Sequence, residues 1–302
     1  MTCSIAVVGA SGFIGKNFVR SATEKGYDVC CLSRTPVECG GQWRHCDVAT
    51  SSIVLPKDTE AVVYLAQSAY YREFPEKADD LFGVNVLGAV RTAQAALRTR
   101  CRFFCYASTG NVYAPSFAPL SEEHPVSRLN PYGLSKLMAE EALQCFVPRL
   151  AVLNARIFGA YGPGQEAMLP YMLLRKIIRN EPIILSLAAL HDNDGLRVSF
   201  IYNDDLACCL LRIVEKALRG DALPPRLNLA GPSPVSIRQM AQTMALLLNR
   251  EVRFLIQDSP RAFDLVADIS LLEQLVAPRF TPLEDGLRAV CAPFSENMHC
   301  WG

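Results

Sequence analysis

The sequence predicts an α/β fold in which a doubly wound parallel sheet carries a smaller C-terminal lobe. Three observations lead to this prediction. Gly9, Gly12 and Gly15 form a turn directly after an apolar run, apolar strands then alternate with helical stretches, and this alternation weakens after residue 164. Continuous apolar strands separated by helices are typical of a parallel sheet that is covered on both faces.

The first elements are a buried strand at Ile5 to Val8, the glycine turn and a helix predicted over residues 13–25. In this order, backbone N–H groups and the positive end of the helix can receive a dinucleotide pyrophosphate, as in a Rossmann-type fold. A glycine-rich turn that binds nothing is the alternative. We assign to the cofactor the turn residues Gly9, Ser11, Gly12, Phe13, Ile14 and Gly15.

The alternation continues along the next 140 residues. Strands are predicted over residues 28–32, 43–46, 61–65, 103–107 and 151–157, and helices over residues 78–98 and 132–145. These elements define a nucleotide-binding Rossmann domain over residues 1–164, and residues 200–229 are predicted to return to its sheet. Residues 165–199 and 230–302 then form a substrate-binding lobe, with helices predicted over residues 168–179 and 237–248. A cleft between the lobes is the expected place for a small molecule.

Composition excludes several classes of partner. The 302 residues contain 30 Lys and Arg against 30 Asp and Glu, so no net charge attracts the protein to nucleic acid or to an anionic membrane. Apolar stretches stay well short of the ~20 residues that cross a bilayer, and Met1 to Ser4 lead into the first strand without a basic segment. We therefore expect a cytoplasmic protein.

The cysteines do not suggest disulfides or a metal site. Twelve of them are scattered through predicted strands and helices, which indicates reduced and mostly buried thiols. Cys39, His45 and Cys46 form the one cluster worth weighing for zinc. This cluster has neither a paired Cys-x-x-Cys half nor a fourth ligand at suitable spacing, so no metal is expected.

The end of the second strand bears on the choice of cofactor. About twenty residues after the glycine turn, NAD-selective sites usually carry an acid for the ribose 2′-hydroxyl. This chain has Ser33 and Arg34 there. A hydroxyl and a guanidinium suit a 2′-phosphate, which favours NADP(H) over NAD(H), although a merely solvated Arg34 is the alternative. Asp47 is placed to accept a hydrogen bond from the adenine amino group.

Three residues form a candidate acid–base set. Thr109 lies near the end of the fifth strand, and Tyr132 and Lys136 lie four residues apart on one face of the following helix. A phenol with a pKa of about 10 is a poor base at neutral pH, and a nearby ammonium lowers that pKa. Tyr132 would exchange a proton with a substrate oxygen, Thr109 would hydrogen-bond that oxygen, and Lys136 would also reach the nicotinamide ribose.

With these motifs the chain resembles the extended short-chain dehydrogenases/reductases, in particular the NAD-dependent epimerase/dehydratase family that modifies nucleotide sugars. The resemblance covers nearly the whole chain and includes the glycine turn, Tyr132 with Lys136, and Thr109 followed by Val112-Tyr113. It also matches Tyr161-Gly162-Pro163-Gly164, which leads into the substrate lobe. The further cofactor contacts that it implies are Asp47, Val48, Leu65, Ala66, Gln67 and Asn85.

The resemblance also implies where the substrate binds. Arg197 and the Arg261-x-x-Asp264 motif fall where family members hold the diphosphate and ribose of a sugar nucleotide. Two fixed cations would supply the local attraction that a neutral protein otherwise lacks. The remaining substrate contacts expected are Tyr70, Thr109, Gly110, Asn111 and Gly159. The loop over residues 67–72, which follows the fourth strand, is expected to border the substrate; surface aromatic residues without a ligand are the alternative.

Differences from the family pattern reduce the number of reactions that the chain is expected to catalyse. Sugar 4,6-dehydratases carry an Asp-Glu pair after the catalytic threonine, whereas this chain has Gly110 and Asn111, so dehydration is not expected. Gly159 stands where many epimerases have a substrate-binding asparagine. We therefore expect NADPH-dependent reduction of a 4-keto sugar nucleotide. Epimerisation at C4 with a retained cofactor, reduction of a non-nucleotide carbonyl, and a non-catalytic NADP-binding sensor are the alternatives.

The predicted helices over residues 78–98 and 132–145 carry apolar side chains on more than one face. One face covers the sheet. The family commonly dimerises through these two helices, so the resemblance implies a homodimer.

Overall fold

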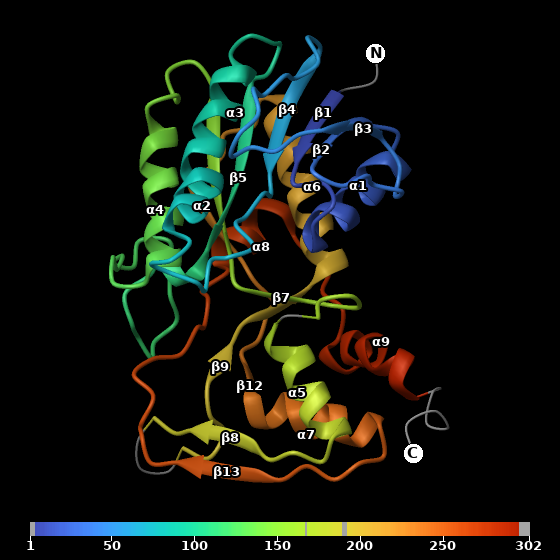
Figure 1. Cartoon of the computed structure of the whole chain (residues 1–302), viewed down its shortest axis with the longest axis vertical. Helices are drawn as coiled ribbons and strands as arrows, with labels where there is room; N and C mark the ends of the chain where they lie inside the picture. Colours follow the sequence, from blue (N-terminus) through green and yellow to red (C-terminus); the bar gives the residue numbers. More distant parts are fainter. Residues whose placement is uncertain (1–3, 167, 189–191, 296–302) are drawn as a thin grey trace.

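The computed structural model describes residues 4–166, 168–188 and 192–295 and has two lobes (Figure 1). The upper lobe contains a parallel sheet with the strand order β11-β6-β5-β4-β1-β2-β3. Its strands are β1 (Ser4–Val8), β2 (Asp28–Ser33), β3 (Gln42–His45), β4 (Thr59–Tyr64), β5 (Phe103–Thr109), β6 (Ala151–Ile157) and β11 (Arg226–Leu229). The predicted doubly wound α/β fold is thereby confirmed.

Helices cover both faces of this sheet. Helices α1 (Phe13–Glu24), α6 (Asn203–Arg219) and α8 (Ser270–Val276) contribute to one core, and α3 (Ala89–Ala96) and α4 (Pro131–Gln144) to the other. In β1, Ile5 and Val7 pack into the first core, whereas Ala6 and Val8 pack into the second. Because both faces are buried, Ile5 to Val8 of this strand are all apolar and do not alternate with polar residues.

The helix predicted over residues 78–98 is interrupted. It consists of α2 (Ala78–Phe82), a π-helical turn (Gly83–Gly88) and α3. Two buried tyrosines of the sheet donate hydrogen bonds to carbonyls of this turn, Tyr64 to Val84 at 2.6 Å and Tyr106 to Asn85 at 2.9 Å. These bonds stabilise the wider turn, and such turns are frequent at functional sites.

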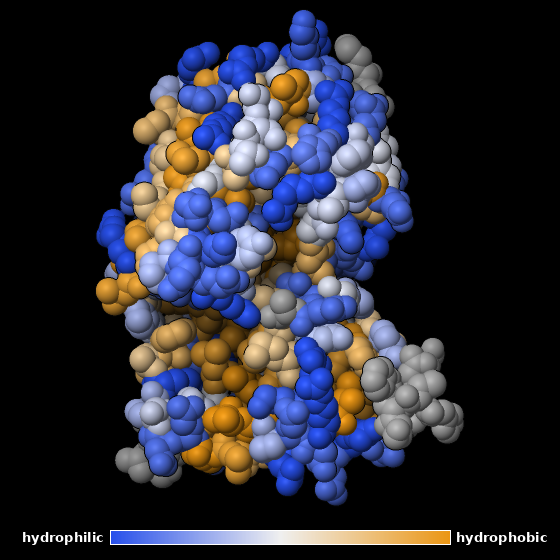
Figure 2. Space-filling model, in the orientation of Figure 1, coloured by the Kyte–Doolittle hydropathy of each residue, from blue (hydrophilic) through white to orange (hydrophobic). Residues whose placement is uncertain are grey.

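The lower lobe has its own core. It is formed by α5 (Leu169–Ile178), α7 (Ile237–Leu247), α9 (Leu283–Ser295) and the strand pairs β8 (Ile183–Ser186) with β13 (Phe254–Gln257) and β9 (Arg197–Val198) with β12 (Val235–Ser236). Figure 2 shows hydrophobic side chains gathered on this lobe, where Ile184 and Leu255 are exposed.

Residues 200–229, which are expected to return to the central sheet, contribute strands to two different sheets. Strand β11 lies at the edge of the central sheet, but β10 (Phe200–Tyr202) pairs with β7 (Gly159–Tyr161) in a sheet of two strands. A Cβ at Gly159 would lie 2.5 Å from the Phe200 ring, so this pairing needs a residue without a side chain there. Phe200 itself therefore does not rejoin the central sheet.

An extended segment over residues 264–268 connects the two lobes. The backbone N–H of Asp264 donates to Ser116 at 2.8 Å, and Leu120 exchanges backbone hydrogen bonds with Val266 and Asp268 in the upper lobe. Leu265 and Arg197 of the lower lobe are joined by a backbone bond of 2.9 Å. One stretch of chain is therefore bonded to both lobes.

Within the described ranges, no helix is both long enough and apolar enough to span a membrane. The same part of the chain contains no group of three or more His, Cys, Asp or Glu side chains arranged to bind a metal ion. Met1 to Cys3, which are expected to lead directly into the first strand, lie outside the described residues.

Candidate active site

A cleft of about 1010 Å³ lies beyond the carboxyl ends of the strands of the central sheet. In an open α/β sheet, this is where ligands bind. The predicted site residues that line it are Gly9, Ser11, Gly12, Phe13, Ile14, Gly15, Ser33, Arg34, Asp47, Val48, Leu65, Ala66, Gln67, Thr109, Asn111, Tyr132 and Lys136. The predicted site residues outside its lining are Tyr70, Asn85, Gly110, Gly159, Arg197, Arg261 and Asp264.

The glycine turn is packed so closely that side chains would disrupt it. Gly9 has a φ of +86°, and a Cβ there would lie 2.6 Å from the backbone nitrogen of Ala66. A Cβ at Gly15 would lie 2.3 Å from the carbonyl oxygen of Gly9. Helix α1 begins directly after Gly12, so its N-terminus opens into the cleft. Backbone N–H groups and a helix N-terminus in this position fit a dinucleotide pyrophosphate.

Of the two residues predicted to bind a 2′-phosphate, Ser33 is already hydrogen-bonded within the protein. Its hydroxyl donates to the carbonyl of Thr35 at 2.6 Å and accepts from the indole of Trp43 at 3.2 Å. A hydroxyl has a single proton, so Ser33 cannot donate to a phosphate without breaking the first bond. Arg34 is exposed at the cleft and is the charged group available there.

Asp47 and Asn85 lie in different surroundings. Asp47 lines the cleft, and its carboxylate accepts from the backbone N–H of Ala49 at 3.0 Å. Asn85 is fully buried in the π-helical turn. Its side chain accepts from the Ser68 N–H at 3.0 Å and donates to the Ser135 hydroxyl at 2.9 Å. Asn85 thus joins the turn to two segments that carry cleft residues.

The start of α4 brings Tyr132 into the cleft. Asn130 caps this helix, because its side-chain oxygen accepts from the backbone N–H groups of Tyr132 at 2.9 Å and Gly133 at 3.2 Å. A Cβ at Gly133 would lie 2.3 Å from the carbonyl oxygen of Asn111, so glycine allows the helix to pack against the turn that follows β5. The phenol is thereby placed beside Thr109.

Tyr132 is surrounded by cleft residues. Its hydroxyl donates to the side-chain oxygen of Gln67 at 2.8 Å, and its ring centroid lies 4.9 Å from that of Tyr71. Burial raises the pKa of Tyr132 well above the ordinary value, and a hydrogen bond from Thr109 partly opposes this change. The protein by itself therefore keeps the phenol protonated, as a general acid requires.

Lys136 lies one helical turn further along α4 and is almost fully buried. Its Nζ donates to the Ala107 carbonyl at 2.8 Å and lies 5.0 Å from the centre of the Tyr106 ring. Burial lowers the pKa of Lys136 to about 7, although the nearby Glu140 carboxylate raises it. The amino group of Lys136 is thus held by β5 at the lining of the cleft.

The two predicted diphosphate-binding arginines meet on one carboxylate. Nε of Arg197 lies 2.9 Å from one oxygen of Asp264, and Nε of Arg261 lies 2.9 Å from the other. Arg261 is also ion-paired with Asp192. Burial raises the pKa of Asp264, but the hydrogen bonds from both arginines outweigh it and hold the pKa below its usual value. Arg261 is mostly buried, whereas the Arg197 side chain is 44% exposed and remains accessible.

Several cleft residues were not predicted from the sequence. They include Asp80, Asn130, Phe158, Gln165 and Met168. The loop over residues 67–72 is expected to border the substrate, with Tyr70 as the named contact. Ser68, Ala69, Tyr71 and Arg72 of this loop line the cleft, whereas Tyr70 does not. Loop conformation leaves no periodic signal in the sequence, which is why the choice between adjacent tyrosines could not be made.

Comparisons with known proteins concern the family and the fold. Residues 5–230 match the model of the NAD dependent epimerase/dehydratase family. The chain is 27% identical over 270 residues to the GDP-6-deoxy-D-mannose reductase of Pseudomonas aeruginosa, covering 86% of this chain and 85% of that protein. It is 26% identical over 150 residues to the UDP-glucose 4-epimerase of Lactobacillus helveticus, a match that covers 46% of each protein.

The fold is also similar to solved structures. The UDP-glucuronic acid 4-epimerase of Bacillus cereus, in complex with UDP-glucuronic acid and NAD, superimposes with a TM-score of 0.84 at 20% identity. This match covers 97% of the present chain and 99% of the other. At this identity, the likeness concerns the fold alone.

Proposed function

The chain belongs to the NAD-dependent epimerase/dehydratase family, and from this we infer that it transfers hydride at C4 of a nucleoside-diphosphate sugar. The proposed direction is reduction of a 4-keto sugar nucleotide, with NADPH as the favoured cofactor. The observation that carries this proposal is the position of the Tyr132 phenol and the Thr109 hydroxyl in the same cleft as the glycine turn.

In this proposal the glycine turn and the α1 N-terminus bind the pyrophosphate, and Asp47 accepts from the adenine amino group. The nicotinamide, when bound, supplies the hydride. Thr109 hydrogen-bonds the substrate carbonyl oxygen, and Tyr132 donates its proton to that oxygen as the carbonyl becomes an alcohol. Lys136 lies one helical turn away, where an ammonium stabilises the phenolate that remains.

Two observations favour reduction over its alternatives. Arg34 stands at the rim of the cleft with a charge that suits a 2′-phosphate. The match to the GDP-6-deoxy-D-mannose reductase covers 86% of this chain, whereas the match to the UDP-glucose 4-epimerase covers 46%. Dehydration is disfavoured because Gly110 and Asn111 provide no carboxyl groups to act as acid and base. A non-catalytic sensor is disfavoured because it would not need Thr109, Tyr132 and Lys136.

Epimerisation at C4 is the second candidate. The match to a UDP-glucose 4-epimerase favours it. It would use the same Thr109 and Tyr132, with the cofactor retained through both half-reactions.

The two reactions can be separated directly. The protein is incubated with NADPH and a panel of sugar nucleotides, including freshly made 4-keto forms, while NADPH absorbance and product configuration at C4 are followed. We expect one NADPH to be consumed for each 4-keto sugar reduced. Interconversion of two sugars by a protein that retains oxidised cofactor, without consumption of NADPH, would contradict the reductase assignment.

The cofactor preference depends on Arg34 in this proposal. Arg34→Ala is expected to raise the KM for NADPH by about 10- to 100-fold and to leave the KM for NADH nearly unchanged, because it removes one charge-assisted hydrogen bond to the 2′-phosphate. Both constants are measured by steady-state kinetics. Arg44→Ala is the control, since Arg44 lies on β3 outside the cleft lining. If Arg34→Ala changes the KM for NADPH and the KM for NADH equally, Arg34 does not bind the 2′-phosphate.

A further inference from the structure

A hydrogen bond from α6 reaches the first residue of α1, next to the glycine turn. Asn203, the first residue of α6, donates from its side-chain Nδ2 to the carbonyl oxygen of Phe13 at 2.9 Å. The two residues are 190 positions apart in the sequence, and Figure 1 shows their helices side by side. Phe13 and Ile14 line the cleft, whereas Asn203 lies behind them, outside its lining. The bond therefore acts on the cofactor cleft from outside.

The two polar atoms of the Asn203 side chain have different surroundings. A carbonyl oxygen only accepts hydrogen bonds, so the amide nitrogen of Asn203 has to face Phe13. No described group donates to Oδ1 of Asn203, although the residue is only 2% exposed. An unpaired buried oxygen destabilises a fold, and leucine, which is similar in size, would avoid it. The favourable contribution of this asparagine therefore comes from its bond to Phe13.

This bond involves the peptide group that joins Phe13 to Ile14. In a helix, the carbonyl of a peptide group points toward the C-terminus and its N–H points toward the N-terminus. The first N–H groups of a helix have no acceptor within it, so the N–H of Ile14 is directed from the start of α1 into the cleft. A donor at the carbonyl polarises the peptide group, which makes the N–H a stronger donor. The same bond fixes the orientation of the peptide plane.

We propose that Asn203 is a positioning residue for the cofactor, which holds the Phe13–Ile14 peptide so that the Ile14 N–H donates to the pyrophosphate. This inference rests on the proposed function, because it takes the ligand at the glycine turn to be a dinucleotide. The sequence predicts cofactor contacts for Phe13 and Ile14 but assigns no role to Asn203. Since NADP⁺ and NAD⁺ share the pyrophosphate, Asn203 is expected to affect the binding of both equally.

Asp204, the next residue of α6, provides the matched control. Its carboxylate lies 2.8 Å from a terminal nitrogen of Arg20 and also accepts a hydrogen bond from Asn17, both of which stand further along α1. Asp204→Asn thus weakens the contact between the two helices without changing the bond to Phe13. If Asn203 only packs α6 against α1, both positions should have similar effects on cofactor binding. If Asn203 positions the peptide, only its own substitution should have an effect.

The test measures the dissociation constants of the full-length protein for NADP⁺, NAD⁺ and adenosine 2′-phosphate by calorimetry. We expect Asn203→Leu to weaken the binding of NADP⁺ and NAD⁺ by the same factor, about three- to tenfold, which corresponds to the loss of one hydrogen bond. Adenosine 2′-phosphate has no pyrophosphate, so its affinity should not change. Asn203→Ala is smaller and should give the same result, so a poor fit of leucine does not decide the outcome. Asp204→Asn should change each constant by less than about twofold.

Unchanged affinity for both dinucleotides in Asn203→Leu and Asn203→Ala would overturn the inference. A loss of the same size in Asp204→Asn would also overturn it, because the effect would then come from helix packing. The same holds for an equal loss of affinity for adenosine 2′-phosphate, since that ligand makes no pyrophosphate contact. Failure of the wild-type protein to bind NADP⁺ or NAD⁺ would instead contradict the proposed function.

Discussion

Tyr132→Phe is expected to reduce turnover by about 10²- to 10⁴-fold while the affinity for the cofactor is retained. The change removes a single oxygen, and that oxygen is the group proposed to exchange the proton with the substrate. The ring remains to pack against Tyr71, whose centroid lies 4.9 Å away. Turnover is followed by NADPH absorbance, and cofactor binding by fluorescence or calorimetry.

Tyr71→Phe is the matched control, because it removes the same atom from a neighbouring cleft residue. The Tyr71 hydroxyl contacts the sulfur of Met168 at 3.7 Å, a weak bond whose loss should change turnover by less than about threefold. Full turnover in Tyr132→Phe would exclude the phenol as the acid. Wild-type protein that binds the cofactor but turns over no member of the sugar panel would favour a sensor.

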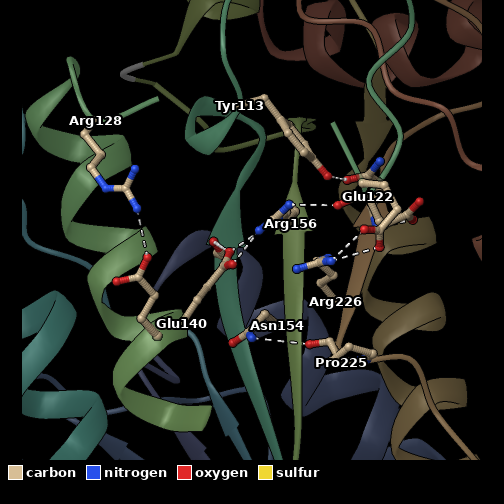
Figure 3. Close-up of polar contacts among 12 residues, drawn as sticks. Tyr113, Glu122, Arg128, Glu140, Asn154, Arg156, Pro225 and Arg226 are labelled. Atoms are coloured by element: carbon tan, nitrogen blue, oxygen red, sulfur yellow. Dashed lines mark hydrogen bonds and ion pairs between the residues drawn. The ribbon is translucent and has the colours of Figure 1, made fainter. Parts of the chain in front are cut away.

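Glu140→Gln is expected to lower the free energy of unfolding by about 3–5 kcal/mol, because it leaves the buried Arg156 guanidinium without its counter-charge. Figure 3 shows this pair between α4 and β6. Nε and a terminal nitrogen of Arg156 lie 3.0 Å and 2.7 Å from the two carboxylate oxygens of Glu140. Ser108 also donates to this carboxylate, and the guanidinium lies 4.8 Å from the Tyr113 ring centre.

The next residue of the same helix provides the control. Glu141 pairs with Arg128 at 3.4 Å, but both side chains are more than half exposed. Glu141→Gln should therefore change stability by less than about 1 kcal/mol. Both variants are compared by denaturant unfolding at neutral pH. If Glu140→Gln and Glu141→Gln have the same free energy of unfolding, the buried Glu140–Arg156 pair contributes no more to stability than the exposed Glu141–Arg128 pair.

Much of the sheet could be predicted because its signals are local. Apolar runs such as Ile5 to Val8 define the strands, and the glycine turn identifies where the ligand site begins. The π-helical turn could not be predicted in this way. It is stabilised by hydroxyl groups of Tyr64 and Tyr106, which come from strands distant in the sequence, while the local pattern over residues 78–98 is that of an ordinary helix.

The candidate site also has a part that could be predicted from the sequence and a part that could not. Thr109, Tyr132 and Lys136 stand in motifs with recognisable spacing, and the structure places all three at one cleft. The partners of these groups depend on how distant segments pack. Gln67 beside the phenol and Asp192 beside Arg261 are examples, since neither pairing has a fixed spacing in the sequence.

The segment over residues 264–268 has a consequence for how ligands enter and leave. A rigid-body rotation that separated the lobes would have to break its backbone bonds either to Ser116 and Leu120 of the upper lobe or to Arg197 of the lower lobe. Such opening is costly, whereas rotamer changes of Tyr71 and Met168 at the rim are not. Selectivity and the residence time of a reactive intermediate are therefore expected to depend on these rim side chains, which makes them sensible positions for altering the range of sugars accepted.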